Sequence, residues 1–201
     1  AGEGIATLRY DKRLIGQSQT GQRESDIRFE DYIGDAKKWI SKLKQDARFS
    51  KVIVIGHSEG SLIGMIAARD AKADMFISVA GVSKPADEVI LEQTKGLPTH
   101  LYNETIAILD SLRKGKTVSH VNPNLAALFR PSVQPYMISW MKYDPSKEIQ
   151  QLRIPILIIQ GTADLQVGVD HARQLAASAP RAELKIIENM NHVLKIVETD
   201  R

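Results

Sequence analysis

The stretch VIVIGHSEGSLIG, residues 52–64, decides the fold. It begins with four apolar residues typical of a buried strand and ends in an apolar stretch with small side chains, typical of a helix. Between them, Gly56, Ser58 and Gly60 form the pattern Gly-x-Ser-x-Gly. A strand that turns sharply into a helix at this pattern holds the serine at positive φ and exposes its hydroxyl. The stretch therefore predicts that Ser58 is a nucleophile.

Glu59 follows Ser58 at the predicted start of the helix. The N-terminus of a helix carries a partial positive charge. We therefore expect the backbone N–H of Glu59 to donate to an oxyanion. The carboxylate of Glu59 could contact the substrate, but a solvated acid at a helix start needs no such role.

Apolar runs alternate with helical patterns along most of the chain. A helix is predicted where Phe29, Ile33 and Ala36 begin a series at steps of three and four. Another covers residues 59–70, and a third ends at Pro180. Strands are predicted at residues 4–10, 51–55, 75–80, 154–160 and 184–187. This alternation predicts an α/β fold in which helices flank a mostly parallel sheet.

Residues 85–152 depart from the alternation, because they carry helical patterns and prolines but no convincing strand. We interpret them as a helical cap inserted between two parts of the core, residues 1–84 and residues 153–201. Apolar side chains of the insertion, Phe129 and Trp140 among them, either pack it onto the core or line an apolar pocket over the site. Both interpretations stay open at this point.

A serine hydroxyl is a weak nucleophile until a base removes its proton, and the base needs a carboxylate to orient it. With this topology, the acid and then the histidine are expected just after later strands. Asp164 follows the strand predicted at residues 154–160, and His192 follows the last strand. The sequence therefore predicts catalytic roles for Ser58, Asp164 and His192.

Other charged or titratable residues could also take part in the site. Asp164 could be a turn residue, with Asp170 as the acid. His57 precedes the serine, and it is more typical of a packed neighbour than of a catalyst. The charged group at residues 9–13 is more typical of structural ion pairs than of a substrate clamp.

The chain resembles the α/β-hydrolase superfamily, and within it the bacterial serine aminopeptidase-like (S33-type) or acyl-ester hydrolase branch. The resemblance covers nearly the whole chain and rests on LRYDKR at residues 8–13, GHSEG at 56–60, GTAD at 161–164 and NH at 191–192. It implies that Ser58, Asp164 and His192 are nucleophile, acid and base. One departure is Leu14, where such chains usually have glycine, and we interpret it as a loop change.

The resemblance also implies that N-terminal strands are missing from this chain. In such folds one further strand lies between those predicted at residues 4–10 and 51–55, and the loop after it carries the second oxyanion donor. Residues 1–3 can supply neither, so we expect a missing N-terminal segment of the same protein to be a partner of this chain. Without it, each buried and unpaired backbone group would cost about 1–3 kcal/mol.

The composition argues against several other kinds of protein. The 201 residues contain no cysteine, which excludes disulfides, a thiolate nucleophile and cysteine-bound metal. The net charge is only +3 and the basic residues are scattered, so no nucleic-acid partner is indicated. No apolar run reaches membrane-spanning length, and no HExxH or clustered His/Asp pattern indicates a metal. We expect no cofactor, whereas compartment and oligomeric state stay open.

The predicted function is hydrolysis by acyl transfer through Ser58. Small carboxylic esters are the first substrate expectation, because the insertion is apolar. An aminopeptidase or amidase is the nearest alternative, and it would need acids in the insertion to bind a substrate ammonium. The candidates for that role are Asp87, Glu88 and Glu92. A non-catalytic fragment or binding protein on the same scaffold is the third possibility, because fold does not fix function.

Overall fold

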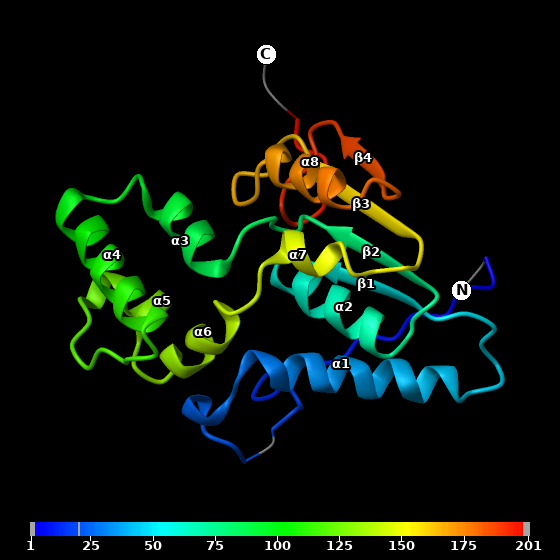
Figure 1. Cartoon of the computed structure of the whole chain (residues 1–201), viewed down its shortest axis with the longest axis horizontal. Helices are drawn as coiled ribbons and strands as arrows, with labels where there is room; N and C mark the ends of the chain where they lie inside the picture. Colours follow the sequence, from blue (N-terminus) through cyan, green and yellow to red (C-terminus); the bar gives the residue numbers. More distant parts are fainter. Residues whose placement is uncertain (1–2, 20, 199–201) are drawn as a thin grey trace.

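The computed structural model describes residues 3–19 and 21–198. Four parallel strands form one sheet in the order β1-β2-β3-β4 (Figure 1). Apolar residues pair across it: Ile55 lies opposite Ile77, and Ile77 lies opposite Leu157. The strands are β1 (Ile53–His57), β2 (Met75–Val79), β3 (Ile156–Gly161) and β4 (Glu183–Ile187). They lie close to four of the predicted strands, and the predicted parallel α/β sheet is confirmed.

Helices of the core pack on this sheet and on one another. Helix α2 packs on β1 and β2, α8 packs on β3 and β4, and α1 packs on α2. The apolar series predicted for α1 is its buried face, which includes Phe29, Ile33 and Ala36. The core helices are α1 (Phe29–Lys44), α2 (Glu59–Asp70), α7 (Pro145–Ile149) and α8 (Val169–Ser178), with a 3₁₀ helix, η1, at Glu24–Asp26.

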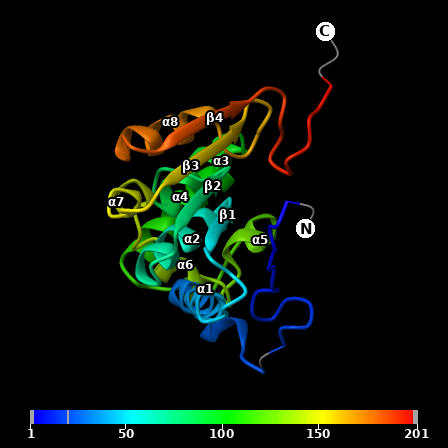
Figure 2. The same ribbon diagram turned by 90° about the vertical axis from the view of Figure 1, so that its right-hand side faces the viewer.

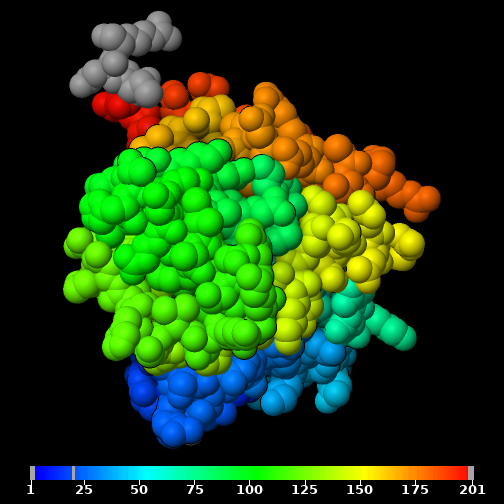
Figure 3. Space-filling view, turned by 60° about the vertical axis from the view of Figure 1, so that its left-hand side comes forward, coloured from blue at the N-terminus to red at the C-terminus, as the bar shows by residue number. Residues whose placement is uncertain are grey.

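The chain between β2 and α7 forms a helical lobe. In Figure 1 this lobe lies beyond the carboxyl ends of the strands, and in Figure 3 its residues, in green, cover most of the face turned forward. It contains α3 (Ala86–Thr94), α4 (Thr99–Arg113), η2 (Pro123–Leu125), α5 (Ala126–Phe129) and α6 (Gln134–Trp140). The lobe has an apolar cluster of its own, in which Phe129 is 0% exposed. Phe129 therefore packs the lobe and does not line a pocket.

The lobe is joined to the core around the start of α1. The Phe29 backbone N–H donates to Ser139 Oγ at 2.8 Å, and the Phe29 ring stacks on Trp140 with centroids 6.0 Å apart. Arg130 and Ser132 both donate to the Glu24 carboxylate. Trp140 is thus a packing residue between lobe and core, as one of the two interpretations proposed.

One predicted strand is wrong. Gly4 is in a bend with φ 68°, residues 5–10 belong to no strand, and Ile5, Leu8 and Tyr10 are 64%, 40% and 40% exposed. An extended segment becomes a strand only when a neighbour pairs with its backbone. Figure 2 shows this segment and the chain after β4 on the side of the sheet away from α7 and α8.

The sheet is open along β1. Within the described residues β1 pairs only with β2, so its outer edge has no strand partner. A Cβ added at Gly64 of α2 would lie 3.2 Å from Val54, so Val54 faces that helix. Its neighbours Ile53 and Ile55 point to the opposite face, where they are 48% and 65% exposed. Parallel sheets normally have both faces covered, and here one face is apolar and open.

Candidate active site

The turn after β1 has the predicted geometry of a nucleophile elbow. Ser58 has φ 55° and ψ −124°, a conformation that non-glycine residues rarely adopt. Its backbone N–H donates to the Val79 carbonyl at 2.9 Å, which ties the turn to the end of β2. A Cβ at Gly56 would lie 2.2 Å from the Gly60 carbonyl oxygen, so only glycine fits at Gly56. At Gly60, by contrast, a Cβ would meet nothing within 4 Å.

The backbone N–H of Glu59 is available beside the serine. It forms no hydrogen bond with any described residue, as expected for the first N–H of a helix. The Glu59 side chain, however, is engaged: it pairs with the Lys12 ammonium and accepts a hydrogen bond from the Tyr136 hydroxyl. The carboxylate is therefore not the solvated acid that the sequence suggested.

Asp164 lies just beyond β3, and both oxygens of its carboxylate have hydrogen-bond partners. Its Oδ1 accepts the backbone N–H groups of Gln166 and Val167 at 2.8 and 2.9 Å. Its Oδ2 accepts from Gln160 Nε2 at 3.1 Å and lies 2.8 Å from His192 Nδ1. Burial alone would raise the pKa of Asp164, but these hydrogen bonds outweigh it and lower the pKa below its usual value. The carboxylate stays ionised and orients His192.

The loop that carries His192 is fixed against the loop that carries Asp164. A Cβ at Gly161 would lie 1.9 Å from the Met190 carbonyl oxygen, so glycine permits this close approach. The Ala163 N–H donates to the same carbonyl at 3.1 Å. The glycine of the GTAD motif thus has a packing role between the two loops.

His57 supports the histidine loop from the other side. Its Nε2 lies 2.8 Å from the His192 carbonyl oxygen, and the two ring centroids are 4.8 Å apart. His192 therefore lies next to the residue that precedes Ser58. His57 is thus a neighbour of His192, as the sequence interpretation proposed, but it is exposed and not packed in the interior.

The structure does not form the predicted hydrogen bond between Ser58 and His192. Within the described residues, Ser58 Oγ has no hydrogen-bond partner, and of the two ring nitrogens of His192 only Nδ1 has one. Catalytic hydrogen bonds are often long without substrate and tighten in the complex. The hydrogen bond between Asp164 and His192 is thus present, whereas the one between His192 and Ser58 is not.

Asp170, the alternative acid, and His171, the histidine next to it on α8, have other partners. The side chain of Asp170 is 84% exposed and pairs with Arg173 on the same helix. His171 Nδ1 accepts from the Ser83 backbone N–H at 3.1 Å, and burial lowers the pKa of His171. Neither residue contacts Ser58 or His192.

Sequence reasoning missed Gln160, which has no motif of its own. It is 0% exposed, and its amide nitrogen donates to Asp164 and, at 2.8 Å, to the Val167 carbonyl. Its Oε1 is buried without a partner among the described residues. The only signal was a polar residue at the end of an otherwise apolar strand.

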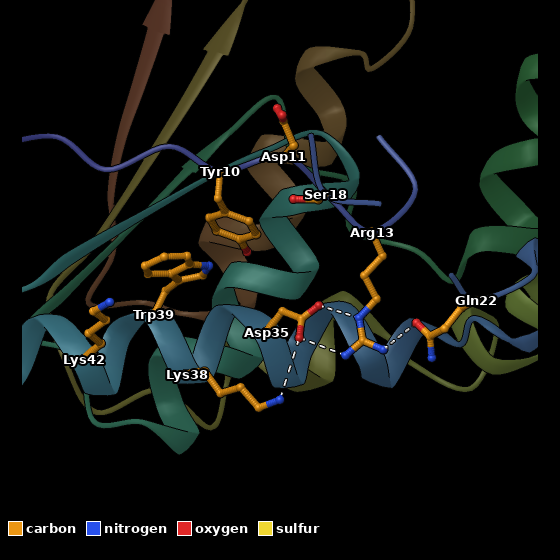
Figure 4. A pocket seen from close by; sticks show the side chains of 9 residues that line it. All are labelled: Tyr10, Asp11, Arg13, Ser18, Gln22, Asp35, Lys38, Trp39 and Lys42. Atoms are coloured by element: carbon orange, nitrogen blue, oxygen red, sulfur yellow. Dashed lines mark hydrogen bonds and ion pairs between the residues drawn. The ribbon is translucent and has the colours of Figure 1, made fainter. Parts of the chain in front are cut away.

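The charged group at residues 9–13 forms structural ion pairs. Arg13 donates to both oxygens of Asp35, at 2.6 and 2.8 Å, and to Asp31 at 3.1 Å. This pairing forms one wall of a cavity of about 450 Å³ between the N-terminal segment and α1 (Figure 4). The Tyr10 ring stacks on Trp39 there, and none of the predicted catalytic residues lines it.

Leu14, the departure from the family pattern, has φ 65°. That left-handed conformation favours glycine, which such chains usually carry here. The turn thus keeps its backbone shape, and the Leu14 N–H donates to the Ser18 carbonyl at 2.9 Å.

Two further searches cover the described part of the chain. Among residues 3–19 and 21–198, no group of three or more His, Cys, Asp or Glu side chains is placed to hold a metal ion. Within the same residues, no helix is long and apolar enough to cross a membrane.

Comparison with known proteins gives a consistent result. Residues 1–200 match the family described as serine aminopeptidase, S33. Esterase EstD of Thermotoga maritima is 30% identical over 203 residues, which cover 96% of this chain and 46% of EstD. The chain therefore spans about half the length of the curated relative that it matches.

Two solved structures illustrate the likeness in fold. Est1E from Butyrivibrio proteoclasticus matches with a TM-score of 0.59 at 16% identity, over 85% of this chain and 64% of Est1E. An alpha/beta fold family hydrolase from Bacillus anthracis matches with a TM-score of 0.55 at 18% identity, over 88% of this chain and 72% of that protein. At such identities the likeness concerns the fold.

Proposed function

The chain belongs to the serine aminopeptidase S33 family of α/β hydrolases, and from that premise we propose that it is a serine hydrolase that cleaves carboxylic esters. The observation that carries the proposal is the pairing of a strained Ser58 elbow with a buried Asp164–His192 hydrogen bond of 2.8 Å. The esterase name of a relative at 30% identity supports the ester preference.

The mechanism has two acyl-transfer steps. His192 removes the proton of Ser58 Oγ, and the oxygen attacks the ester carbonyl carbon. The Glu59 N–H donates to the oxygen that becomes negative, and His192 gives its proton to the departing alcohol. Water then attacks the acyl-enzyme with His192 as base, which releases the acid and restores Ser58.

The proposed aminopeptidase alternative is less well supported. A substrate ammonium needs a free carboxylate, but Asp87 pairs with Arg113 at 2.5 Å, and Glu92 pairs with Lys84. Of the three candidates only Glu88 is exposed without an ion pair among the described residues. Acids already neutralised by a basic partner attract a cation weakly. An ester substrate needs no free carboxylate, because it carries no ammonium group. These ion pairs are therefore more compatible with an esterase than with an aminopeptidase.

We propose that the second oxyanion donor comes from a segment that pairs with the edge of β1 left free within the described residues. A segment that paired with the free edge of β1 would end near the elbow, where a loop could offer a backbone N–H. One absent donor typically costs 10²–10³ in rate. We propose that full activity needs this segment, joined to the chain or bound to it.

A substrate panel tests the proposed function. Wild-type chain is assayed with p-nitrophenyl esters of increasing acyl length and with aminoacyl anilides, alongside Ser58→Ala. Ester hydrolysis that exceeds anilide hydrolysis and disappears in Ser58→Ala is the expected result. Anilide hydrolysis that dominates would favour the aminopeptidase, and a chain inert towards both would favour a binding protein.

A further inference from the structure

The carboxylate of Glu59 joins three segments that are far apart in the sequence. It pairs with the ammonium of Lys12, which lies 47 residues earlier, before α1. It also accepts the hydroxyl hydrogen of Tyr136, which lies 77 residues later, on α6 of the lobe. The carboxylate is 25% exposed, so the contacts form in a partly desolvated site. Each is therefore stronger than the same contact in water.

Both partners of Glu59 are held in turn. Lys12 Nζ lies 5.0 Å from the centre of the Tyr32 ring, and that ring meets the Tyr136 ring edge-on at 5.5 Å. The Tyr136 ring also packs 6.0 Å from Phe29. Burial, and then the charge of Glu59, strongly raise the pKa of Tyr136, so its hydroxyl keeps its proton and remains a donor.

Glu59 also carries the free N–H beside Ser58. Ser58 lies at positive φ, and its carbonyl accepts the Ser61 N–H of the first turn of α2 at 2.9 Å. A side chain fixed at both carboxylate oxygens restrains the rotation of its own backbone. The contacts of the carboxylate and the direction of the N–H are thus mechanically linked.

We propose that Glu59 is a positioning residue: its carboxylate, held between Lys12 and Tyr136, keeps its own N–H directed at the substrate oxyanion. The inference rests on the proposed hydrolytic function of Ser58. It assigns α6 of the lobe a part in the rate of acyl transfer, since Tyr136 supplies one of the two contacts. It also makes the side chain of Glu59 a structural link and not a substrate contact.

The variant Tyr136→Phe removes one contact and keeps the ring. Removing an oxyanion donor outright costs 10²–10³ in rate, so a misdirected donor is expected to lower kcat about tenfold. KM should stay within about twofold, because the contact acts only when the oxyanion forms. Tyr143→Phe is the matched control: Tyr143 also packs on Phe29, but its hydroxyl donates to Glu30 at 3.3 Å, on α1. It should leave kcat unchanged.

A boronic acid supplies a second measurement that does not need turnover. Ser58 Oγ adds to boron, its proton passes to His192, and a negatively charged tetrahedral adduct forms that resembles the transition state. We expect Tyr136→Phe to bind phenylboronic acid about tenfold more weakly than wild type and Tyr143→Phe to bind it equally well. Lys12→Met should behave like Tyr136→Phe, and Lys12→Arg, which keeps the charge, should recover most of the loss.

The outcomes separate this inference from the proposed function. Equal kcat and equal boronate affinity in Tyr136→Phe and Tyr143→Phe, with only thermal stability changed, would overturn the positioning role while ester hydrolysis by wild type stands. A wild-type chain that neither hydrolyses esters nor binds the boronate would overturn the proposed function and this inference with it.

Discussion

Asp164 shows how single residues set the chemistry of the site. Four donors surround its carboxylate, and two of them are backbone N–H groups of the turn that follows it. The turn residues therefore hold the carboxylate in place for the role of acid that we propose for it. The same donors make Asp164 a contributor to folding as well as to the orientation of His192.

Acid titration tests that contribution. The pKa of Asp164 in the folded chain is lower than in the unfolded chain, where it is about 3.9. Its stabilising effect is therefore complete above about pH 4 and is lost as the pH falls through the folded-state pKa. We expect Asp164→Asn to lower the free energy of unfolding at pH 7. The difference in unfolding free energy between wild type and variant should become smaller as the pH is lowered.

Urea unfolding at several pH values measures this dependence. Asp170→Asn is the control. It makes the same chemical change at the surface, because the Asp170 side chain is 84% exposed. The account would be contradicted if the loss of unfolding free energy in Asp164→Asn stayed constant from pH 7 to pH 3. It would also be contradicted if Asp164→Asn and Asp170→Asn lost the same amount.

At the scale of the element, the elbow depends on one glycine more than on the other. A side chain at Gly56 collides with the backbone carbonyl of Gly60, whereas a side chain at Gly60 meets open space. Gly56→Ala is expected to cost about 1–3 kcal/mol or more, because backbone atoms would have to move. Gly60→Ala should be neutral or stabilising by up to about 1 kcal/mol, since alanine favours a helix.

Chemical denaturation of the two alanine variants provides the measurement. The sequence pattern treats both glycines alike, and the structure distinguishes them. Equal destabilisation by the two substitutions would show that the close approach in the structure is wrong.

Phe129 tests the packing of the helical lobe. The side chain is fully buried in the apolar cluster to which all helices of the lobe, α3, α4, η2, α5 and α6, contribute. We expect Phe129→Ala to cost about 3–5 kcal/mol in unfolding free energy. The ratio of kcat/KM values for short and long esters should remain as in wild type. A variant of normal stability and altered acyl preference would restore the pocket-lining interpretation.

Sequence reasoning reached the elements that depend on local patterns. The periodic apolar residues Phe29 and Ile33 predicted α1 correctly, because periodicity and burial coincide there. The apolar run before Gly56 predicted β1 correctly as a strand but not as a buried one, since Ile53 and Ile55 are exposed. It failed at residues 4–10, since an apolar run becomes a strand only if a partner strand exists. It also missed the contacts of Glu59 and Gln160, which join residues distant in sequence and leave no local pattern.

At the scale of the whole molecule, the open face of the sheet is the main departure from a closed core. Ile53 and Ile55 are exposed there beside an unpaired strand edge, and exposed apolar patches commonly mark binding surfaces. Native chain should therefore bind the dye ANS. Ile55→Thr should reduce the fluorescence, whereas Ile106→Thr, at a residue 41% exposed on α4, should not. An open apolar face would be contradicted if ANS did not fluoresce with the native chain. It would also be contradicted if Ile55→Thr and Ile106→Thr changed the fluorescence equally.

The central claim is that His192 activates Ser58 as a nucleophile, and labelling with a fluorophosphonate tests it most directly. The reagent forms a phosphorus–oxygen bond with an activated serine and releases fluoride. Native wild-type chain should take up one label, located at Ser58 by peptide mass spectrometry. Ser58→Ala should take up none, and His192→Ala should react far more slowly while circular dichroism shows that it is still folded. Absence of label on native wild type, or equally fast labelling of His192→Ala, would contradict the account.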